Sequence, residues 1–121
     1  MTAVAARPFV AVLSRVPLAT VAIVDALQEV AEVRAFTSLH GDALSLLRSV
    51  APDAIVADGP EQAESAAEYA RGTGIPVLYV SLTERLLRVL DDDGWRIEAA
   101  RPSSESLRNA LAEAIYRRVP A

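Results

Sequence analysis

The feature that most constrains this chain is a repeated alternation of short apolar runs with longer stretches of helical periodicity. Three of the runs, residues 9–13, 54–57 and 77–80, are continuously apolar. Such runs are typical of strands that are buried on both faces of a sheet. Because a strand followed by a helix usually returns to pair in parallel, the alternation predicts a parallel sheet with helices on both faces.

Five strand–helix units are expected in all. Two further strands carry charges on alternate residues, as edge strands do, at positions 32–36 and 95–100. The order that follows is 2-1-3-4-5, a flavodoxin-like, doubly wound sheet of five parallel strands. The expected helices occupy residues 18–30, 38–50, 61–71, 81–90 and a stretch from 103 onward.

Three of these helices have informative sequences. The third would bury only small residues and should therefore lie close to the sheet; these are Ala63, Ala66, Ala67 and Ala70. Ser81 and Glu84 have the spacing of a capping box, which indicates that a fourth helix begins at Ser81. The first helix would present an apolar stripe through Leu18, Val21, Val24, Leu27 and Ala31.

Length and composition set limits on function. The 121 residues suit a single domain, 1–121, with a flexible N-terminus at 1–8 and the start of a linker at 117–121. The absence of cysteine excludes disulfides, thiol catalysis and cysteine-ligated metals. A single histidine, His40, excludes a multi-histidine metal site. All twelve basic residues are arginine, so lysine chemistry is excluded as well.

The charge and the apolar runs bear on partners and location. A net charge of −4 argues against nucleic-acid binding by this domain alone. No apolar run reaches the ~18–20 residues that span a membrane, and residues 1–9 lack the pattern of a secretory signal. A cytoplasmic location and no membrane partner are therefore expected.

In a doubly wound sheet, ligands bind at the carboxyl ends of the strands. The polar residues expected there, as the lining of one pocket, are Ser14, Arg15, Asp58, Ser81 and Arg101. Neither G-x-G-x-x-G nor G-x-x-x-x-G-K-[ST] occurs, which argues against a nucleotide or flavin site. No nucleophile–base pair or metal constellation is visible, so an enzyme is not expected.

Three segments carry a family resemblance that covers almost the whole chain: residues 52–58 (PDAIVAD), residues 76–81 (PVLYVS) and Arg101-Pro102. They resemble the receiver domain of two-component response regulators. The resemblance implies that Asp58 holds the phosphoacceptor position. It also implies that Ser81 stands for the conserved Thr or Ser, and Arg101 for the conserved lysine.

The departures from the family are in its active site. Ser14 and Arg15 stand where the family has two acidic Mg²⁺ ligands, and Glu98 stands where an aromatic switch residue is common. A cation at Arg15 would repel Mg²⁺, so no cofactor is expected. Arg15 or Arg101 could instead pair with Asp58 permanently, since a guanidinium matches a carboxylate at two points.

The leading hypothesis is therefore an atypical receiver-like domain that binds a protein partner or an output domain and is not phosphorylated by the usual Mg²⁺-dependent route. Two alternatives stay open: a working receiver phosphorylated on Asp58, and a small-ligand sensor that uses the pocket at the strand ends. Structural roles are open as well, because Asp58 and Ser81 both suit the start of a helix.

Receivers often dimerise through the fourth helix, the fifth strand and the last helix. Here that face would offer side chains of both signs, which could pair across a two-fold axis. They are Arg85, Arg88, Asp92, Arg96 and Arg108. The alternative is an ordinary charged surface.

Overall fold

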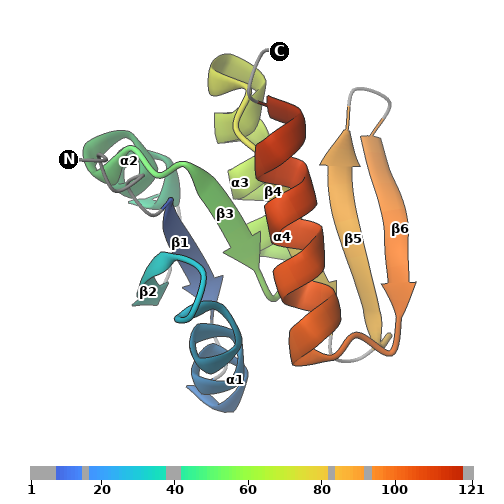
Figure 1. Ribbon diagram of the computed structural model, residues 1–121. Helices are drawn as coiled ribbons and strands as arrows, with labels where there is room; N and C mark the ends of the chain where they lie inside the picture. Colours follow the sequence, from blue (N-terminus) through green and yellow to red (C-terminus); the bar gives the residue numbers. More distant parts are fainter. Residues whose placement is uncertain (1–7, 15–16, 38–41, 82–83, 92–93, 119–121) are drawn as a thin grey trace, which may run out of the picture.

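The computed structural model describes residues 8–14, 17–37, 42–81, 84–91 and 94–118. The described part forms one mixed sheet with helices on both of its faces (Figure 1). The strands are β1 (Phe9–Ser14), β2 (Glu32–Thr37), β3 (Ala54–Ala57), β4 (Val77–Ser81), β5 (Leu86–Asp91) and β6 (Gly94–Ala100). The helices are α1 (Pro17–Leu27), α2 (Asp42–Val50), α3 (Pro60–Thr73) and α4 (Ser104–Arg118).

The strand order is β2-β1-β3-β4-β5-β6. The first four strands in this order pair in parallel, whereas β5 is antiparallel to both β4 and β6. The part of the expected order that runs 2-1-3-4 is confirmed, including β2 at one edge. The five-stranded, all-parallel sheet is wrong, because the last two strands form an antiparallel hairpin.

Helices on the two faces enclose two apolar layers. α1 and α4 lie on the front face in Figure 1, and α2 and α3 lie behind. The front layer gathers Val10, Val12, Val56 and Leu78 with Leu111 of α4. The rear layer gathers alternate residues of the same strands with α2 and α3. β1 and β3 are covered on both sides, which accounts for their unbroken apolar sequence.

α3 packs as its sequence predicts. Its buried residues are Gln62 and the four alanines, Ala63, Ala66, Ala67 and Ala70. The helix ends at Gly74, which has φ 74° and donates its backbone N–H to the carbonyl of Ala70 at 2.7 Å. A left-handed residue at this place is the usual way in which a helix satisfies its last carbonyls, and glycine adopts that conformation without strain.

Replacing Gly74 by alanine is expected to lower the free energy of unfolding by about 1–2 kcal/mol, since a Cβ disfavours the left-handed conformation. Gly72 is the matched control. It lies inside α3 with open space around it, so Gly72→Ala should raise stability by roughly 0.5–1 kcal/mol. Urea unfolding of both variants measures the two changes in the free energy of unfolding. Equal changes of the same sign would contradict the role assigned to Gly74.

The expected fourth helix, residues 81–90, is wrong. Its second half is strand β5, which pairs with β6 in an antiparallel hairpin. The capping-box residues do interact, because the backbone N–H of Glu84 donates to Ser81 Oγ at 3.2 Å. Here the contact closes a turn between β4 and β5 rather than the first turn of a helix.

The physical reason is in the burial pattern of β5. Leu87 and Val89 are buried on the front face, whereas Leu86, Arg88 and Leu90 are only partly buried, which is the alternation of a strand. Asp91 pairs with Gly94 across the hairpin, and Gly94 has φ 119°. Pairing of β5 with both β4 and β6 therefore prevails over the capping-box spacing.

The chain ends also differ in part from expectation. α4 continues to Arg118, so the expected linker at 117–121 begins inside a helix. Of the expected flexible N-terminus, only Pro8 lies within the described residues, where it accepts a backbone hydrogen bond from Glu32.

Candidate functional site

Two of the polar residues expected at the strand ends meet directly. Ser14 Oγ donates a hydrogen bond to Asp58 Oδ2 at 2.5 Å. Ser14 is 3% exposed at the end of β1, and Asp58 is half-buried immediately after β3. A bond of this length to a carboxylate is charge-assisted and stronger than a bond between neutral groups.

The parallel register of β1 and β3 produces this contact. Leu13 pairs with Ala57, so Ser14 and Asp58 continue the two strands at the same level. The backbone N–H of Asp58 also donates to the carbonyl of Leu13 at 3.1 Å. Because side chains alternate along a strand, both residues are directed to the front face, as Val12 and Val56 are.

Ser81 lies at the same edge of the sheet but is directed to the other face. The register pairs Ala57 with Tyr79, so Val80 of β4 is level with Asp58. Val80 belongs to the front layer, and the alternation directs Ser81 to the rear. The Ser81 hydroxyl, 5% exposed, accepts the backbone N–H of Glu84. The described structure therefore does not bring Ser81 into the cluster of Ser14 and Asp58.

Arg101 is separated from Asp58 by the added strand. It follows β6, which is three strands from β3 and hence about 14 Å away at the usual strand spacing. Arg101 is exposed, has φ 53°, and its backbone N–H donates to the carbonyl of Arg85 at 2.7 Å. Arg15, the other arginine expected to pair with Asp58, lies outside the described residues, and that pairing stays a prediction.

The described residues around Asp58 do not supply the ligands that the family resemblance requires for Mg²⁺. The contact that joins Ser14 to Asp58 brings a hydroxyl to the carboxylate, and the hydroxyl proton is directed at the carboxylate. Across the described ranges, no group of three or more histidine, aspartate or glutamate side chains could hold a metal ion.

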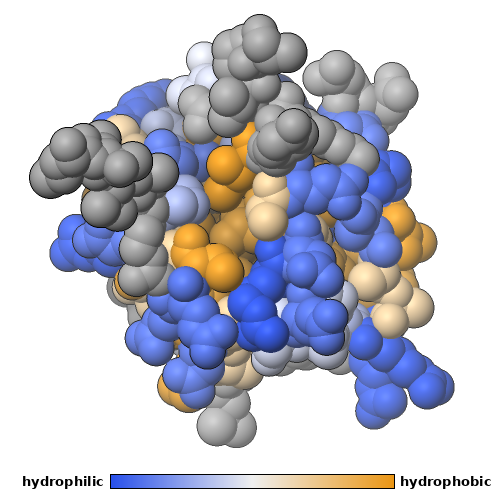
Figure 2. Space-filling model, viewed as in Figure 1, coloured by the Kyte–Doolittle hydropathy of each residue, from blue (hydrophilic) through white to orange (hydrophobic). Residues whose placement is uncertain are grey.

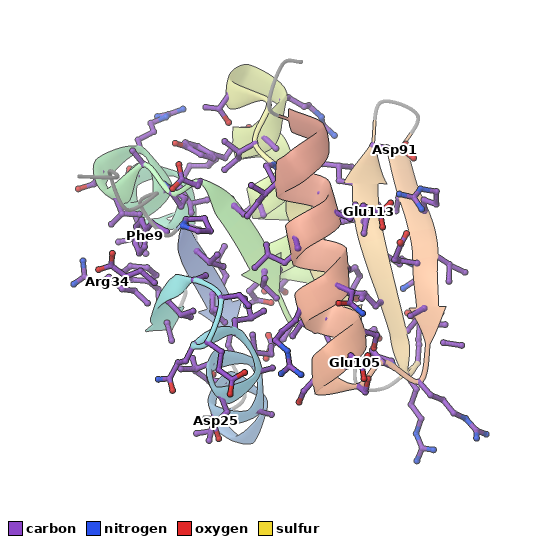
Figure 3. The ribbon with its side chains drawn as sticks, viewed as in Figure 1. Phe9, Asp25, Arg34, Asp91, Glu105 and Glu113 are labelled. Carbon is purple, nitrogen blue, oxygen red and sulfur yellow. The ribbon has the colours of Figure 1, made fainter. Side chains whose placement is uncertain are left out.

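A neighbouring acidic residue has a structural role. Asp53 precedes β3, and its Oδ2 accepts the backbone N–H of Phe9 at 2.8 Å, while its own N–H donates to the Phe9 carbonyl. Asp53 thus joins the beginnings of β1 and β3, at the end of the sheet opposite Asp58; Phe9 is labelled in Figure 3. The Pro-Asp sequence, which contributes to the family resemblance, therefore has a structural role in joining these two strands.

The residues of the expected dimer face are distributed over both faces of the sheet. The Arg108 guanidinium donates to the carbonyl of Ala26 at 3.2 Å, which joins α4 to the last turn of α1 on the front face. Arg88 lies on the rear face, where it forms an ion pair with Glu84 and lies over the Tyr79 ring at 5.7 Å. Asp92 is outside the described residues. The expected face, which depended on a fourth helix, is therefore not assembled as expected.

Two ion pairs lie on the hairpin. The Arg88 guanidinium donates to both carboxylate oxygens of Glu84, and mainly through this contact it lowers the pKa of Glu84 below its ordinary value. Arg96 of β6 pairs with Glu98 and, at 3.3 Å, with Asp91, which Figure 3 labels at the end of β5. The hydrogen bond that Arg96 donates to the Glu98 carboxylate is the main cause that raises the pKa of Arg96. These groups are solvent-exposed, so each pair contributes little to stability.

The rear face of the hairpin was not among the sites expected from the sequence. Trp95 is 38% exposed and Ile97 is 58% exposed, and both are on β6. The Trp95 ring meets Tyr79 edge-to-face, with the centroids 5.7 Å apart. The sequence signal that indicates this face is the alternation of Trp95 and Ile97 with Arg96 and Glu98, provided that the strand lies at an edge of the sheet.

Comparison of the chain with protein-family models, curated proteins and solved structures finds no match. Within the described residues, no helix has both the length and the apolar character needed to cross a membrane.

Proposed function

We propose that this chain is a protein-interaction domain that resembles a receiver in the parallel half of its sheet and does not accept phosphate by the usual Mg²⁺-dependent route. The observation that carries the proposal is the hydrogen bond from Ser14 to Asp58. Ser14 stands where the resemblance requires an acidic metal ligand, and it engages the carboxylate directly.

The chemistry of phosphoryl transfer explains why this hydrogen bond bears on the function. An aspartate that attacks phosphorus uses a lone pair of a carboxylate oxygen, and a strong hydrogen bond makes that oxygen a weaker nucleophile. The transferred group also needs cations near its equatorial oxygens. Serine supplies none, and the separation of Arg101 from Asp58 leaves that guanidinium out of reach. These features favour a structural role for Asp58.

One observation favours the alternative of a working receiver. Asp58 is only half-buried at the edge of the sheet where receivers react, so a small phosphodonor could reach it. The small-ligand sensor has less support, because Ser81 and Arg101 lie apart from Ser14 and Asp58.

Intact-mass measurement after incubation with acetyl phosphate and Mg²⁺ separates the two functions. We expect no phosphate-sized mass gain in the wild-type chain, because the carboxylate accepts a hydrogen bond from a hydroxyl and, among the described residues, no group of three or more metal-ligating side chains is present. Asp58→Asn and Asp53→Asn are the matched variants. A gain that Asp53→Asn retains and Asp58→Asn loses would mean that phosphate moves to Asp58 as acetate leaves, and it would contradict the proposal.

A further inference from the structure

The hairpin leaves two surfaces of the sheet uncovered. β6 is the last strand in the order, and within the described ranges no strand pairs with its outer edge. In Figure 1, α2 and α3 lie behind the parallel strands and do not extend behind β5 and β6. An edge strand directs the backbone N–H and C=O groups of every second residue away from its neighbour, which makes it a template for a further strand.

The same strand exposes large apolar side chains. Trp95 and Ile97 are two residues apart and therefore lie on one face. Figure 2, in the same view, shows hydrophobic residues at the margin of the molecule where Figure 1 has β6. The edge-to-face contact with Tyr79 fixes the Trp95 ring, so little side-chain entropy would be lost on binding. A single exposed apolar residue needs no explanation, but a neighbouring pair on an open edge is typical of an interface.

The charges on β6 point to a second copy of this chain as the partner. Arg96 and Glu98 flank Ile97 on its two sides, and they pair with each other within the chain. In an antiparallel pair of identical strands related by a two-fold axis, residues equally far from the axis lie opposite one another. An axis at Ile97 therefore sets Arg96 opposite Glu98 of the partner subunit, twice.

We propose that two copies of this chain associate through the outer edges of their β6 strands, antiparallel and with the two-fold axis at Ile97. The inference rests on the proposed function, since it names the partner of the interaction domain. The two sheets would join into one, with Ile97 against its equivalent at the centre. Opposite charges facing across the strands favour this register over its neighbours, because like charges directly opposite are destabilising.

The other edge of the sheet is the natural comparison. β2 has a similar pattern with the charges in the reverse order, with Val33 between Glu32 and Arg34. Its large apolar residues, Val33 and Phe36, are however half-buried, and the Arg34 guanidinium lies over the Phe36 ring at 5.8 Å. Figure 3 shows Arg34 at the margin of the sheet opposite the hairpin. Exposed apolar side chains can therefore contribute to association at β6, whereas those of β2 can contribute little.

The contact between the two β6 strands is small, which bears on the affinity that we expect. β6 has seven residues, and a shift in register between Leu87 and Arg88 of β5 leaves Glu98 as the extra residue on β6. This bulge bends the strand beyond Ile97 and confines pairing to its middle. Such a contact is smaller than the roughly 800 Å² per partner of a standard interface, so we expect a dissociation constant in the micromolar range.

Sedimentation equilibrium over a range of concentrations tests the inference on the full chain. We expect a reversible dimer whose dissociation constant rises at least about tenfold in Ile97→Lys, because a charge would be placed at the apolar centre. Val21→Lys is the matched control, since Val21 of α1 is 59% exposed and Ile97 is 58% exposed. It should leave the dimer unchanged, as should Arg34→Glu at the edge of β2.

A charge exchange tests the register. Glu98→Arg should weaken the dimer, because each Arg96 would face an arginine of the partner, and adding Arg96→Glu should restore it. A wild-type chain that stays monomeric throughout, or a dimer weakened by Val21→Lys or Arg34→Glu but not by Ile97→Lys, would overturn the inference. Neither result involves phosphate, so the proposed function would stand. Phosphorylation of Asp58 would contradict that function and leave the measured dimer intact.

Discussion

Replacing Leu87 by alanine is expected to lower the free energy of unfolding by about 2–5 kcal/mol, whereas replacing its neighbour Leu86 should cost much less. Leu87 is fully buried in the front layer, and Leu86 is only partly buried on the other face. The truncated Leu87 would lose its contacts with the helix-covered face and leave a cavity. Urea unfolding of the two variants measures the difference.

This pair of variants also distinguishes a strand from a helix at residues 86–91. Consecutive residues of a strand are directed to opposite faces, while consecutive residues of a helix are only about a quarter-turn apart. If Leu86→Ala and Leu87→Ala destabilise the chain equally, the hairpin would be the wrong structure for this segment. Val89→Ala provides a second check, because Val89 is on the same face as Leu87 and should be costly as well.

Replacing Ser14 by alanine has the second large expected effect, about 1–3 kcal/mol of destabilisation. The variant would remove a hydrogen bond to a carboxylate and leave Asp58 without its nearest donor on β1. A double-mutant cycle with Asp58→Ala isolates the contact from other effects of each change. We expect Ser14→Ala to cost clearly less in the Asp58→Ala background than in the wild type.

The same cycle bears on the role of Asp58. Equal costs of Ser14→Ala in both backgrounds would mean that the two side chains do not interact in solution, and the main support for a structural aspartate would be lost. Small single domains usually unfold in one cooperative step, so two-state analysis of chemical unfolding is appropriate for this comparison.

The parallel half of the fold could be predicted from the sequence because its signals agree with one another. The unbroken apolar runs of β1 and β3 specify burial on both faces, and the four alanines of α3 specify close packing. The buried face of α1 was harder to predict, because nearly all residues of this helix are apolar. Val21, expected on the buried stripe, is exposed, and Ile23 and Ala26 are buried instead.

The hairpin half could not be predicted because two local signals conflict there. Ser81 and Glu84 have the spacing of a helix start, while the Asp-Gly sequence before Trp95 favours a turn between strands. Pairing of β5 with both β4 and β6 decides the outcome, and such pairing is a tertiary effect that overrides local preference. The meeting of Ser14 and Asp58 was predictable from the order of β1 and β3; the separation of Arg101 depended on the extra strand.

The mixed sheet also divides the entropic cost of folding unevenly along the chain. β4 pairs with β5, and β5 pairs with β6, so each of these two pairings closes only a short loop. The pairing of Val10 with Ala54, by contrast, encloses α1, β2 and α2 in the intervening loop. The entropic cost of closing a loop grows with its length and precedes the contacts that the closure makes possible. Most of this cost therefore arises in the parallel half of the sheet. The hairpin, by contrast, forms from residues that are already close in the sequence.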